Sequence, residues 1–586
     1  MSADVSLLIL YATETGNALD AAEQMARETQ RLGYIVRIAS TDTYPSADLV
    51  HEHLVIFMVS TTGSGVEPRS MSALWSLLIR ADLPTDLFDG VSFAVFGLGD
   101  SAYEKFCWAA KKLVRRLSSL GAHEICPHGE GDEQHPLGIE GELDPWMRRV
   151  LSIIKEQQPS TISTLWDAAS LPPPRISIQS ETSKHKEDPD PLENKSDHYL
   201  ARIRCNERIT AQDWFQDVRH IDFQFDQDIQ YAPGDVAVIQ PLASPQDVES
   251  FLTIMGWGNI ADETFTILPA PHGLPISPTV PRKTCLRTLF TRHLDLNAVP
   301  RRSFFQFLRH FPLDELELEK LNEFCSDEGA DDLYAYCFKV RRTIREVTEE
   351  FRSLKIPREY IFDIFPPLRP RQFSIASSVK VHPKHIHLCV AIVQYRTKLK
   401  VPRRGVCTTY LSSLEPGHTL HICIQKGPLS LPEDPSTPVI CVGPGTGVAP
   451  MRSLINERIH LGSTKNTLYF GCRSTEKDQH YAHEWKSHVD AGHLTYRVAF
   501  SRDGAEGTAR IYVQDLITMD RERIWELIDK RNAWVYIAGS SNKMPLAVKG
   551  AIENAAQVVG GQSEEQAKEY LRILQREGRL VEECWS

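Results

Sequence analysis

The segment YATETGNA, residues 11–18, follows a short apolar run and begins an amphipathic stretch. Thr13, Thr15 and Asn17 carry side-chain hydrogen-bond donors, and Gly16 allows the backbone to turn around an anion at the start of a helix. Helix capping alone would also explain such a sequence. The chemistry that these residue types could perform is the binding of a phosphate group.

Two further loops share this position after an apolar run. STTGSG, residues 60–65, and FGLGDSAYEKF, residues 96–106, each follow a stretch typical of a buried strand. In a doubly wound parallel sheet, the loops at the carboxyl ends of the strands meet in one crevice. Because all three loops lack the lysine of an ATP-binding phosphate loop, a monophosphate attached to a flat ring suits them best. The prediction is FMN.

Two segments in the middle of the chain combine a different set of groups. RQFSIASS, residues 371–378, places a cation, an aromatic ring and hydroxyl groups on an extended stretch. RGVCTTYL, residues 404–411, is a glycine-led turn that enters a helix. An ordinary β-strand would explain the residues of the first segment about as well as a binding site would. The two segments together, at their spacing from the glycine-rich loop CVGPGTGVAPMRS (residues 441–453), form a specific pattern that indicates a binding site.

The glycine-rich loop is followed by a segment that contains arginines. SRDGAEGTARIYVQDL, residues 501–516, supplies Arg502 and Arg510, and no acidic residue is placed to bind a ribose 2′-hydroxyl. Arginine side chains match the oxygens of a phosphate group, although arginines on a surface are often only solvated. The pattern favours NADPH over NADH.

The elements that must position these residues fall into four consecutive parts. Residues 1–155 alternate short apolar strands with amphipathic helices, which indicates a doubly wound sheet. Residues 156–196 have the Pro-, Ser- and Lys-rich composition of a flexible linker. Residues 197–435 show strands of period two, interrupted by a helical stretch at about 245–365, and residues 436–586 return to strand–helix alternation.

The bulk composition is that of a multidomain globular protein. The chain has 586 residues, of which 42% are hydrophobic and 24% charged, and its apolar runs are shorter than a membrane span requires. The start of the chain does not resemble a signal peptide, so a cytosolic location is expected. Twelve cysteines occur without a C-x-x-C pair, so no metal site is expected and most cysteines should be reduced and buried.

The net charge of −12 is concentrated near the amino end. Residues 1–155 contain 13 Lys and Arg against 21 Asp and Glu, a net charge of −8. This acidity either serves solubility or steers a basic partner. It disfavours nucleic-acid binding.

The first three loops, together with GEGDEQ around Asp132, resemble the flavodoxin-type domains of diflavin reductases. The resemblance implies FMN contacts at Thr13, Glu14, Thr15, Gly16, Asn17 and Ala18, at Ser60, Thr61, Thr62 and Gly63, and at Leu98, Gly99, Asp100, Tyr103, Phe106 and Asp132. The reductases of the endoplasmic reticulum carry a tyrosine at the position of Thr62, so one aromatic cover of the flavin ring is absent here. Tyr103 is expected to supply the other cover.

The later motifs resemble the ferredoxin–NADP reductase superfamily. For FAD, the resemblance implies Arg371 at the pyrophosphate, Phe373 against the ring and Ser374 near N5, with further contacts at Arg341, Gln372, Cys389, Ala391, Gly405, Val406, Cys407 and Thr408. For NADPH it implies Thr446, Gly447, Arg473, Ser501, Arg502, Arg510, Ile511, Tyr512, Val513 and Gln514. The expected fold is a flavodoxin-like doubly wound sheet, an FAD-binding β-barrel with a helical insertion, and an NADP-binding α/β domain of ferredoxin–NADP reductase type.

The chain ends in VEECWS, with Trp585 one residue from the end. In this family a C-terminal aromatic ring lies on the FAD where nicotinamide must stack, and stacking would order the tail. Glu583 stands where relatives carry an aspartate that helps orient nicotinamide. Ser374, Glu583 and Trp585 are therefore the expected catalytic residues. Ala538 and Ala547 stand where relatives carry a cysteine and an aspartate, so the resemblance does not fix the rate of hydride transfer, whereas the reaction type is expected to be the same.

The resemblance spans nearly the whole chain and implies electron flow from NADPH to FAD, then to FMN, and then to a protein acceptor. Among diflavin reductases, the soluble ones of cytosolic iron–sulfur cluster assembly are most similar, which implies an anamorsin-type iron–sulfur protein as partner. The alternatives are another soluble diflavin reductase, such as the sulfite reductase flavoprotein or a haem-protein reductase, or an interaction scaffold that has lost electron transfer. The oligomeric state is left open.

Overall fold

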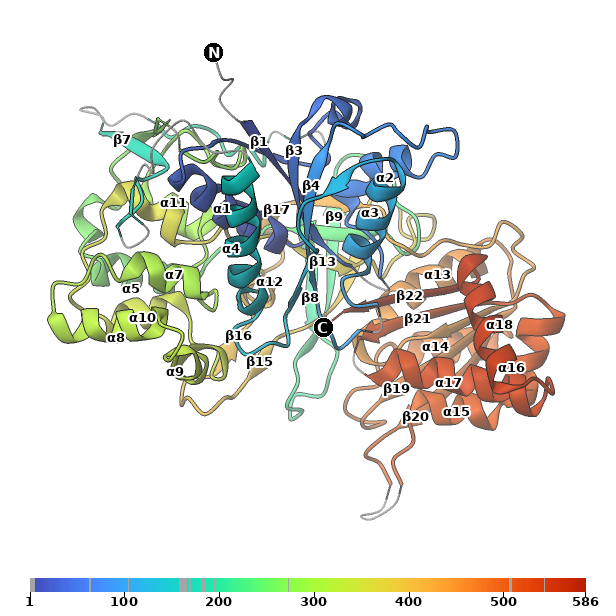
Figure 1. The fold of residues 1–586 in the computed structure, drawn as a ribbon. Coiled ribbons are helices and arrows are strands. Elements are labelled where there is room, and N and C mark those ends of the chain that lie inside the picture. Colours follow the sequence, from blue (N-terminus) through green and yellow to red (C-terminus); the bar gives the residue numbers. More distant parts are fainter. Residues whose placement is uncertain are drawn as a thin grey trace. The chain divides into compact units, whose positions relative to one another are not determined.

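The computed structural model describes residues 6–62, 65–103, 105–157, 166–167, 170–180, 186–193, 195, 197–271, 273–504, 509–541 and 543–585. The chain forms two compact units (Figure 1). The first comprises residues 1–191 and 243–369, and the second comprises residues 192–242 and 370–586. The helical insertion therefore groups with the amino-terminal sheet, while the barrel groups with the carboxyl-terminal sheet.

The amino-terminal part of the first unit is a parallel sheet with strand order β2-β1-β3-β4-β5, in which β6 also pairs with β4. Its strands are β1 (Ser6–Ala12), β2 (Ile35–Ser40), β3 (Leu54–Ser60), β4 (Ser92–Gly99), β5 (His123–Glu124) and β6 (Gly129–Asp132). The central strands β1, β3 and β4 are buried almost throughout. Their near-continuous apolar sequences are typical of strands covered on both faces.

Helices cover both faces of this sheet (Figure 1). On one face, α1 (Asn17–Arg31) and α4 (Glu140–Gln157) pack on a core that includes Trp146. On the other face, α2 (Ser72–Leu78) and α3 (Trp108–Ser119) pack on a core that includes Phe57. The two separate cores show that the sheet is doubly wound, as expected from the strand–helix alternation.

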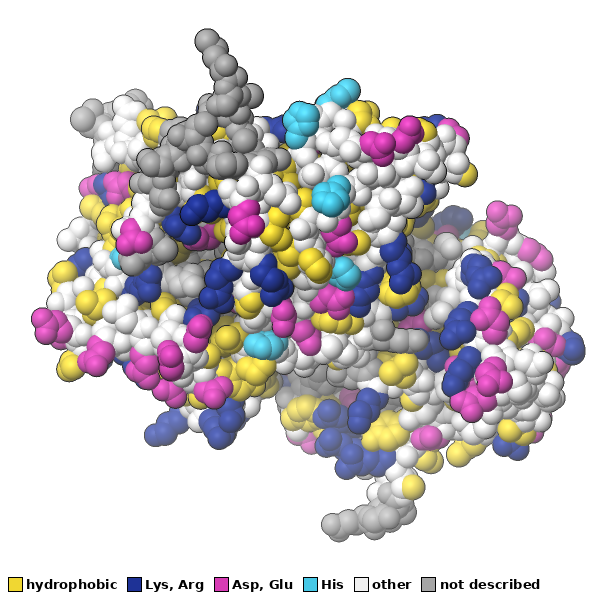
Figure 2. Space-filling model, in the orientation of Figure 1, with side chains coloured by type: hydrophobic (Ala, Val, Ile, Leu, Met, Phe, Trp, Pro, Cys, Tyr) yellow, Lys and Arg dark blue, Asp and Glu magenta, His cyan; other side chains and the backbone are white. Residues whose placement is uncertain are grey.

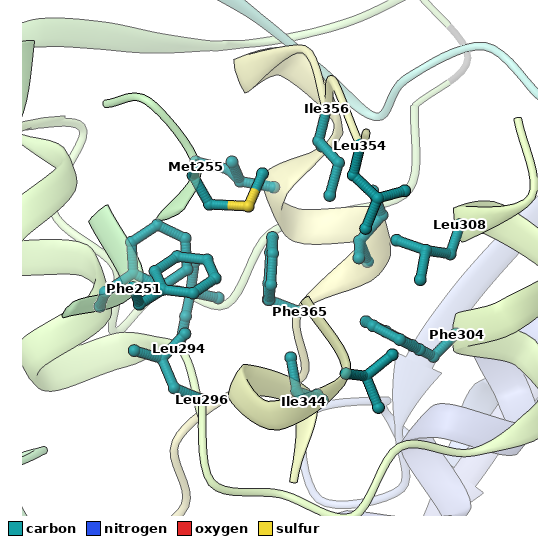
Figure 3. Packing of buried hydrophobic residues seen from close by; sticks show 14 of the residues in the cluster. Phe251, Met255, Leu294, Leu296, Phe304, Leu308, Ile344, Leu354, Ile356 and Phe365 are labelled. Carbon is teal, nitrogen blue, oxygen red and sulfur yellow. The ribbon is translucent and has the colours of Figure 1, made fainter. Parts of the chain in front are cut away.

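The insertion is mainly helical and has its own core. Its helices are α5 (Pro245–Ile254), α6 (Leu286–Thr288), α7 (Arg302–Leu308), α8 (Glu315–Cys325), α9 (Ala330–Leu333), α10 (Ile344–Glu350) and α11 (Ile361–Ile364). Figure 3 shows Phe251, Met255, Phe304 and Phe365 pointing into this core. Two strands of the insertion, β12 (Lys283–Thr284) and β11 (Phe265–Pro269), form a small sheet of order β12-β11-β7 with β7 (Ile176–Ser180), which precedes the insertion in the chain.

Strand β7 lies within residues 156–196, the stretch that has a linker composition. Ile176–Ser180 pair antiparallel with β11, and the side chain of Ile176 is fully buried in the core of the insertion. Just before β7, the buried Arg175 pairs with Asp363 at 3.1 Å and with Glu23 at 2.7 Å. This stretch has a linker composition, yet partners distant in sequence order it. The residues between 157 and 166, and residues 181–185, lie outside the described part of the chain.

The second unit begins with a six-stranded antiparallel barrel of order β13-β10-β17-β8-β9-β14. A bridge between Ile375 and Leu388 links its two end strands. The strands are β8 (His198–Arg208), β9 (Val218–Phe225), β10 (Val236–Ile239), β13 (Arg371–Ser374), β14 (His385–Ala391) and β17 (Thr419–Gln425). The hairpin β15 (Gln394–Tyr395) and β16 (Arg403–Arg404) leads into helix α12 (Val406–Ser413).

The carboxyl-terminal part is a parallel sheet of order β20-β19-β18-β21-β22. Its strands are β18 (Val439–Val442), β19 (Asn466–Cys472), β20 (Leu494–Phe500), β21 (Trp534–Ser540) and β22 (Leu580–Trp585). Its helices are α13 (Val448–His460), α14 (Ala482–Asp490), α15 (Val513–Met519), α16 (Arg521–Trp525), α17 (Lys543–Val558) and α18 (Glu564–Arg576). The order reverses at β18, which places the following loop at a topological switch point, where nucleotides bind in such sheets.

The surface carries charges of both signs, and the cysteines are free and mostly buried. On the face shown in Figure 2, basic and acidic side chains lie next to one another. All twelve cysteines are free thiols, and nine of them are buried. Among the helices of the described residues, none has the length and apolar character needed to span a bilayer.

Candidate functional site

The loop after β1 forms a tight turn that leads into a helix. Gly16 has φ 93°, a left-handed conformation that glycine adopts without strain, and its N–H donates to Thr13 Oγ1 at 2.8 Å. Thr13 N–H in turn donates to Ser70 Oγ at 3.0 Å. The turn runs directly into α1, a helix of 15 residues whose amino end favours negative charge. This geometry fits a phosphate group.

The three amino-terminal loops meet at one edge of the sheet. Ser60 Oγ donates to the carbonyl of Ala12 at 3.2 Å, and Thr61 N–H donates to the carbonyl of Leu98 at 2.9 Å. These bonds join the ends of β1, β3 and β4. The backbone of residues 60, 61 and 98 is therefore positioned by neighbouring strand ends, as a doubly wound sheet requires.

Asp132 ties a fourth segment to this edge. Its Oδ1 accepts hydrogen bonds from Ser101 N–H at 2.9 Å and from Gln134 N–H at 3.0 Å. Burial acts to raise the pKa of Asp132, but these hydrogen bonds outweigh it and hold the pKa below the usual range. Gln134 Nε2 also donates to Asp100 Oδ1 at 2.9 Å. Asp132 thus serves as an ionised anchor that shapes the loop around Asp100.

The side chains expected to flank the flavin ring lie at this edge as well. Tyr103 and Phe106 are half-buried, and Leu98 is buried at the end of β4. Thr62 is half-buried, and its Oγ1 donates to the carbonyl of Val66 at 3.2 Å. Gly63 lies outside the described residues. A phosphate turn, half-buried aromatic rings and converging strand ends together fit FMN.

The side chain of Asn17 contacts residues that are distant in the sequence. Its Oδ1 accepts hydrogen bonds from Arg301 at 2.9 Å and from Arg369 at 3.1 Å, and its Nδ2 donates to Glu133 at 2.9 Å. The amide thus joins the loop to other side chains of the unit. The two arginines, more than 280 positions away, were missed from the sequence because nothing local marks them.

Strand β13 presents the second group of expected residues at the edge of the barrel. It pairs with β10; Arg371 and Gln372 are exposed residues, and Phe373 and Ser374 are half-buried. Ser374 Oγ donates to Glu583 Oε1 at 2.7 Å. Two of the three expected catalytic residues, from strands β13 and β22, are therefore in direct contact.

The turn into α12 places backbone N–H groups at a helix start. Gly405 N–H donates to the carbonyl of Val393 at 2.9 Å, and Thr408 Oγ1 accepts from Val393 N–H at 3.1 Å. Thr408 and Cys407 are buried, so their side chains support the turn. Cys389 on β14 is also buried, and burial raises the pKa of its thiol to about 12. This thiol is therefore neutral. A glycine turn at a helix start beside an aromatic strand fits the pyrophosphate and ring of FAD.

Arg341 lies in the insertion, in the first compact unit. It is exposed and has φ 55°, the left-handed region. Its expected contact with FAD phosphate stays a prediction.

The glycine-rich loop after β18 packs too closely for larger residues. A Cβ on Gly447 would overlap the carbonyl oxygen of Ala538, and one on Gly443 would lie 2.5 Å from the carbonyl oxygen of Gly447. The chain therefore turns tightly between β18 and α13, with Thr446 half-buried in the turn. Such a turn leaves room for the pyrophosphate of a dinucleotide next to the helix.

Two arginines meet beside this loop. Arg502 N–H donates to the carbonyl of Arg473 at 2.9 Å, and Ser501 N–H donates to the carbonyl of Cys472 at 3.0 Å. Burial and the neighbouring charge of Arg502 lower the pKa of Arg473. Like charges held together in this way fit an anionic ligand such as a 2′-phosphate. Arg510, Ile511 and Tyr512 are exposed next to them, followed by the buried Val513 and the half-buried Gln514.

The barrel contributes an aromatic ring to the same region. Phe215, in the loop between β8 and β9, is 66% exposed, and the guanidinium of Arg473 lies over its ring at 4.5 Å. Asp213 of this loop pairs with Lys477 at 2.6 Å. The role of Phe215 could not be predicted from the sequence, because its partner Arg473 lies in another domain and neighbouring residues do not indicate the contact.

The carboxyl-terminal tail is a strand. In the pairing of β22 with β21, Glu583 lies opposite Ala538 and Trp585 opposite Ser540, and Ser541 N–H donates to the carbonyl of Trp585 at 2.9 Å. Backbone pairing therefore orders the tail, and stacking of the Trp585 ring on a flavin stays a prediction. The ring of Trp585 is 38% exposed.

A group of histidines in the second unit was also missed. Asp222, His385 and His387 offer ligand atoms within 4.8 Å of one another, a spacing found in metal sites. Arg452 Nη1, however, lies 3.2 Å from His387 Nδ1, and a guanidinium charge there opposes a cation. Hydrogen bonds, such as that between His385 Nδ1 and Asp222 Oδ1 at 2.8 Å, account for the group.

The fold and the three sites together define a class of protein: a reductase with two flavin sites and a nicotinamide-dinucleotide site on one chain. Family models match in the same order: Flavodoxin at residues 9–146, FAD binding domain at 192–410 and Oxidoreductase NAD-binding domain at 441–549.

Curated relatives cover the whole chain. It is similar to the NADPH-dependent diflavin oxidoreductase 1 of Danio rerio, at 39% identity over 99% of both chains. It is similar at 40% identity to the protein of that name from Cryptococcus neoformans, over 99% of this chain and all of the relative, and at 36% to that from Schizosaccharomyces pombe, over 99% of both. The chain therefore belongs to the NADPH-dependent diflavin oxidoreductase 1 family, whose cofactors are FMN, FAD and NADPH.

Proposed function

We propose that this chain transfers electrons from NADPH to an anamorsin-type iron–sulfur protein, and that it does so in the cytosol. The proposal rests on one combined observation: the chain has three nucleotide sites, and over 99% of its length it is similar to proteins named NADPH-dependent diflavin oxidoreductase 1. The identity of the acceptor comes from the resemblance to soluble diflavin reductases of iron–sulfur assembly. The net charge of −8 in residues 1–155 supports a basic docking surface on the partner.

The residues have separable tasks. When bound, FAD takes up electrons in pairs and FMN passes them on singly. Arg473, Ser501 and Arg502 would hold the phosphates of NADPH, and the turn at Gly443–Gly447 would admit its pyrophosphate. Ser374 Oγ holds a proton that it donates to the carboxylate of Glu583, 2.7 Å away, so this pair orients polar groups where nicotinamide is expected. Trp585, at the end of β22, would cover the flavin until nicotinamide replaces it.

The test is reduction of the purified acceptor by the full-length protein. With NADPH present, the visible spectrum of an oxidised anamorsin-type protein should change to that of its reduced form at catalytic enzyme concentrations. The rate should fall as salt rises, because salt screens the attraction between exposed charges. A sulfite reductase haemoprotein and a haem acceptor serve as comparisons. Faster reduction of either of them would favour the alternative diflavin reductases. Purified protein without flavins would favour a scaffold.

Location can be tested separately. Fractionation should place the protein with cytosolic markers, and recovery in another compartment would contradict that part of the proposal.

A further inference from the structure

Arg301 of the insertion and Arg369, just after the insertion and in the same compact unit, contact the turn that is expected to hold the FMN phosphate. Arg369 Nη2 donates to the carbonyl of Gly16 at 3.0 Å, and its Nη1 donates to Asn17 Oδ1 at 3.1 Å. Arg301 Nη2 donates to the same Oδ1 at 2.9 Å. Both guanidinium groups also pair with Asp20 in the first turn of α1, at 2.8 and 3.3 Å. The two side chains thus enclose the junction between loop and helix.

The side chain of Arg369 also fills the space beside Gly16 of the turn. A Cβ on Gly16 would overlap its guanidinium, so the arginine lies directly against this glycine. Together with Arg301 it holds the Asn17 amide oxygen, while the amide nitrogen is bonded to Glu133. The loop conformation is therefore stabilised from the insertion, because hydrogen bonds to charged donors are stronger than neutral ones.

Charged groups surround this junction. The two guanidinium groups pair with the carboxylate of Asp20, and the carboxylate of Glu133 accepts from the Asn17 amide nitrogen on the other side. The side chains of Arg301, Arg369 and Asp20 are only 23–26% exposed, which leaves their field less screened than that of surface charges. A phosphate dianion in the turn would be attracted by the two guanidinium groups in addition to the helix dipole.

We propose that Arg301 and Arg369 form a clasp on the phosphate loop, so that FMN affinity depends on the docking of the insertion against α1. The two equilibria are then linked: FMN favours docking by the same factor by which docking favours FMN. Loss of the clasp releases the phosphate end of the flavin while the aromatic contacts of the ring persist. The inference rests on the proposed assignment of this loop to the FMN phosphate.

A neighbouring arginine provides a matched control. Arg302 N–H donates to Glu140 Oε2 at 2.8 Å, and its Nη1 lies 3.3 Å from Asp144. Both acids belong to α4, so Arg302 links the insertion to the same sheet domain at a helix that does not follow the phosphate loop. Replacing the Arg302 side chain removes the ion pair with Asp144 and so weakens docking, while the backbone bond to Glu140 and the charge at the junction of loop and α1 stay unchanged.

The test compares two flavins in the full-length protein after removal of FMN, with FAD retained. Binding of FMN and of riboflavin, which lacks the phosphate, is titrated by flavin fluorescence for the wild type, R301A, R369A, the double variant and R302A. The double variant should bind FMN about tenfold more weakly and riboflavin with unchanged affinity, because only the phosphate meets the lost charge. R301K/R369K should recover most of the loss, and FAD content reports that the fold is intact.

Each outcome decides a separate point. Equal weakening of FMN and riboflavin, or a loss in R302A as large as in R369A, would show that docking alone matters and would overturn the clasp. Unchanged FMN affinity in the double variant would overturn it as well. If the wild type binds no FMN at all, the assignment of the loop fails, which is a different result from failure of the clasp.

Discussion

Ser374 and Glu583, which are 209 positions apart, are joined by a hydrogen bond of 2.7 Å. The serine ends a barrel strand, and the glutamate lies on the last strand of the nucleotide-binding sheet. The contact therefore couples the FAD-binding and NADPH-binding domains at the position where the hydride is expected to pass.

Removing either partner of this pair should slow the reduction of FAD by NADPH. A hydrogen bond to a charged group contributes about 1.5–3 kcal/mol, so S374A and E583Q should each lower the stopped-flow rate by about 10–100-fold. The double variant should lose less than the product of the two effects, since both changes break one contact.

The control for this pair lies on the same strand. Glu582 pairs with Lys549 at 3.1 Å, and alternate side chains of a strand point to opposite faces, so E582Q should leave the rate within about twofold. Independent, multiplicative effects of S374A and E583Q would contradict a shared role.

Replacing Trp585 should raise the use of NADH. The strand pairing of its backbone does not depend on the side chain, so W585A should remove the ring and retain the tail. Stacking contributes about 0.5–1.5 kcal/mol beyond burial, and kcat/KM for NADH should therefore rise by up to about tenfold. Steady-state kinetics with both nucleotides measure this, with C584A as the neighbouring control. An unchanged NADPH/NADH ratio would show that the ring does not compete with nicotinamide.

Phe215 should matter for NADPH binding although it lies in the barrel. The cation–π contact with Arg473 contributes about 0.5–1 kcal/mol at an exposed site, so F215A should raise KM for NADPH by about two- to fivefold with kcat unchanged. F215Y should restore the wild-type KM. D213A, which breaks the ion pair of the same loop with Lys477, should leave KM unchanged. An equal rise of KM for NADPH in D213A would mean that the position of the loop, and not the ring of Phe215, determines NADPH binding.

The half-buried His220 and the buried His387 should make the second unit sensitive to acid. Burial, followed by the charge of Arg452, lowers the pKa of His220 to about 4 and that of His387 to about 2. The charged and titratable neighbours of His387 are His220, His382, His385, Asp222 and Arg452. A histidine of lowered folded-state pKa is protonated first in the unfolded chain. Its stabilising contribution is therefore complete above about pH 6.5 and is lost as the pH falls below it.

The expected loss is about 1.4 kcal/mol per pH unit for each such histidine below pH 6.5. Melting temperatures between pH 7.5 and 5 should therefore fall, and H387N should fall less steeply because asparagine keeps an acceptor for Arg452 without titrating. The exposed His483 provides the control variant H483N. If the melting temperatures of H387N and of the wild type fall equally steeply with pH, His387 does not contribute to the loss of stability in acid.

Much of this architecture follows from patterns that are local in the sequence. The alternation of apolar strands and amphipathic helices predicted the doubly wound sheet, and the glycine-containing turns after strands predicted where phosphates should bind. Such patterns suffice because strand burial and turn geometry depend on neighbouring residues, and because strand ends in a parallel sheet converge. For the same reason Ser374, Gly447 and the turn at Thr13–Gly16 could be located without a structure.

Other features depended on packing between distant segments. Composition indicated a linker at Ile176–Ser180, yet pairing with β11 makes it a strand. The tail at Trp585 is held by β21, and Asn17 is held by Arg369 across 352 positions. A charged side chain carries no mark of its partner in the sequence, because its energy depends on the distance to an opposite charge. The sequence by itself determined the kinds of nucleotide that bind, and the tertiary structure decided which side chains hold the binding loops in place.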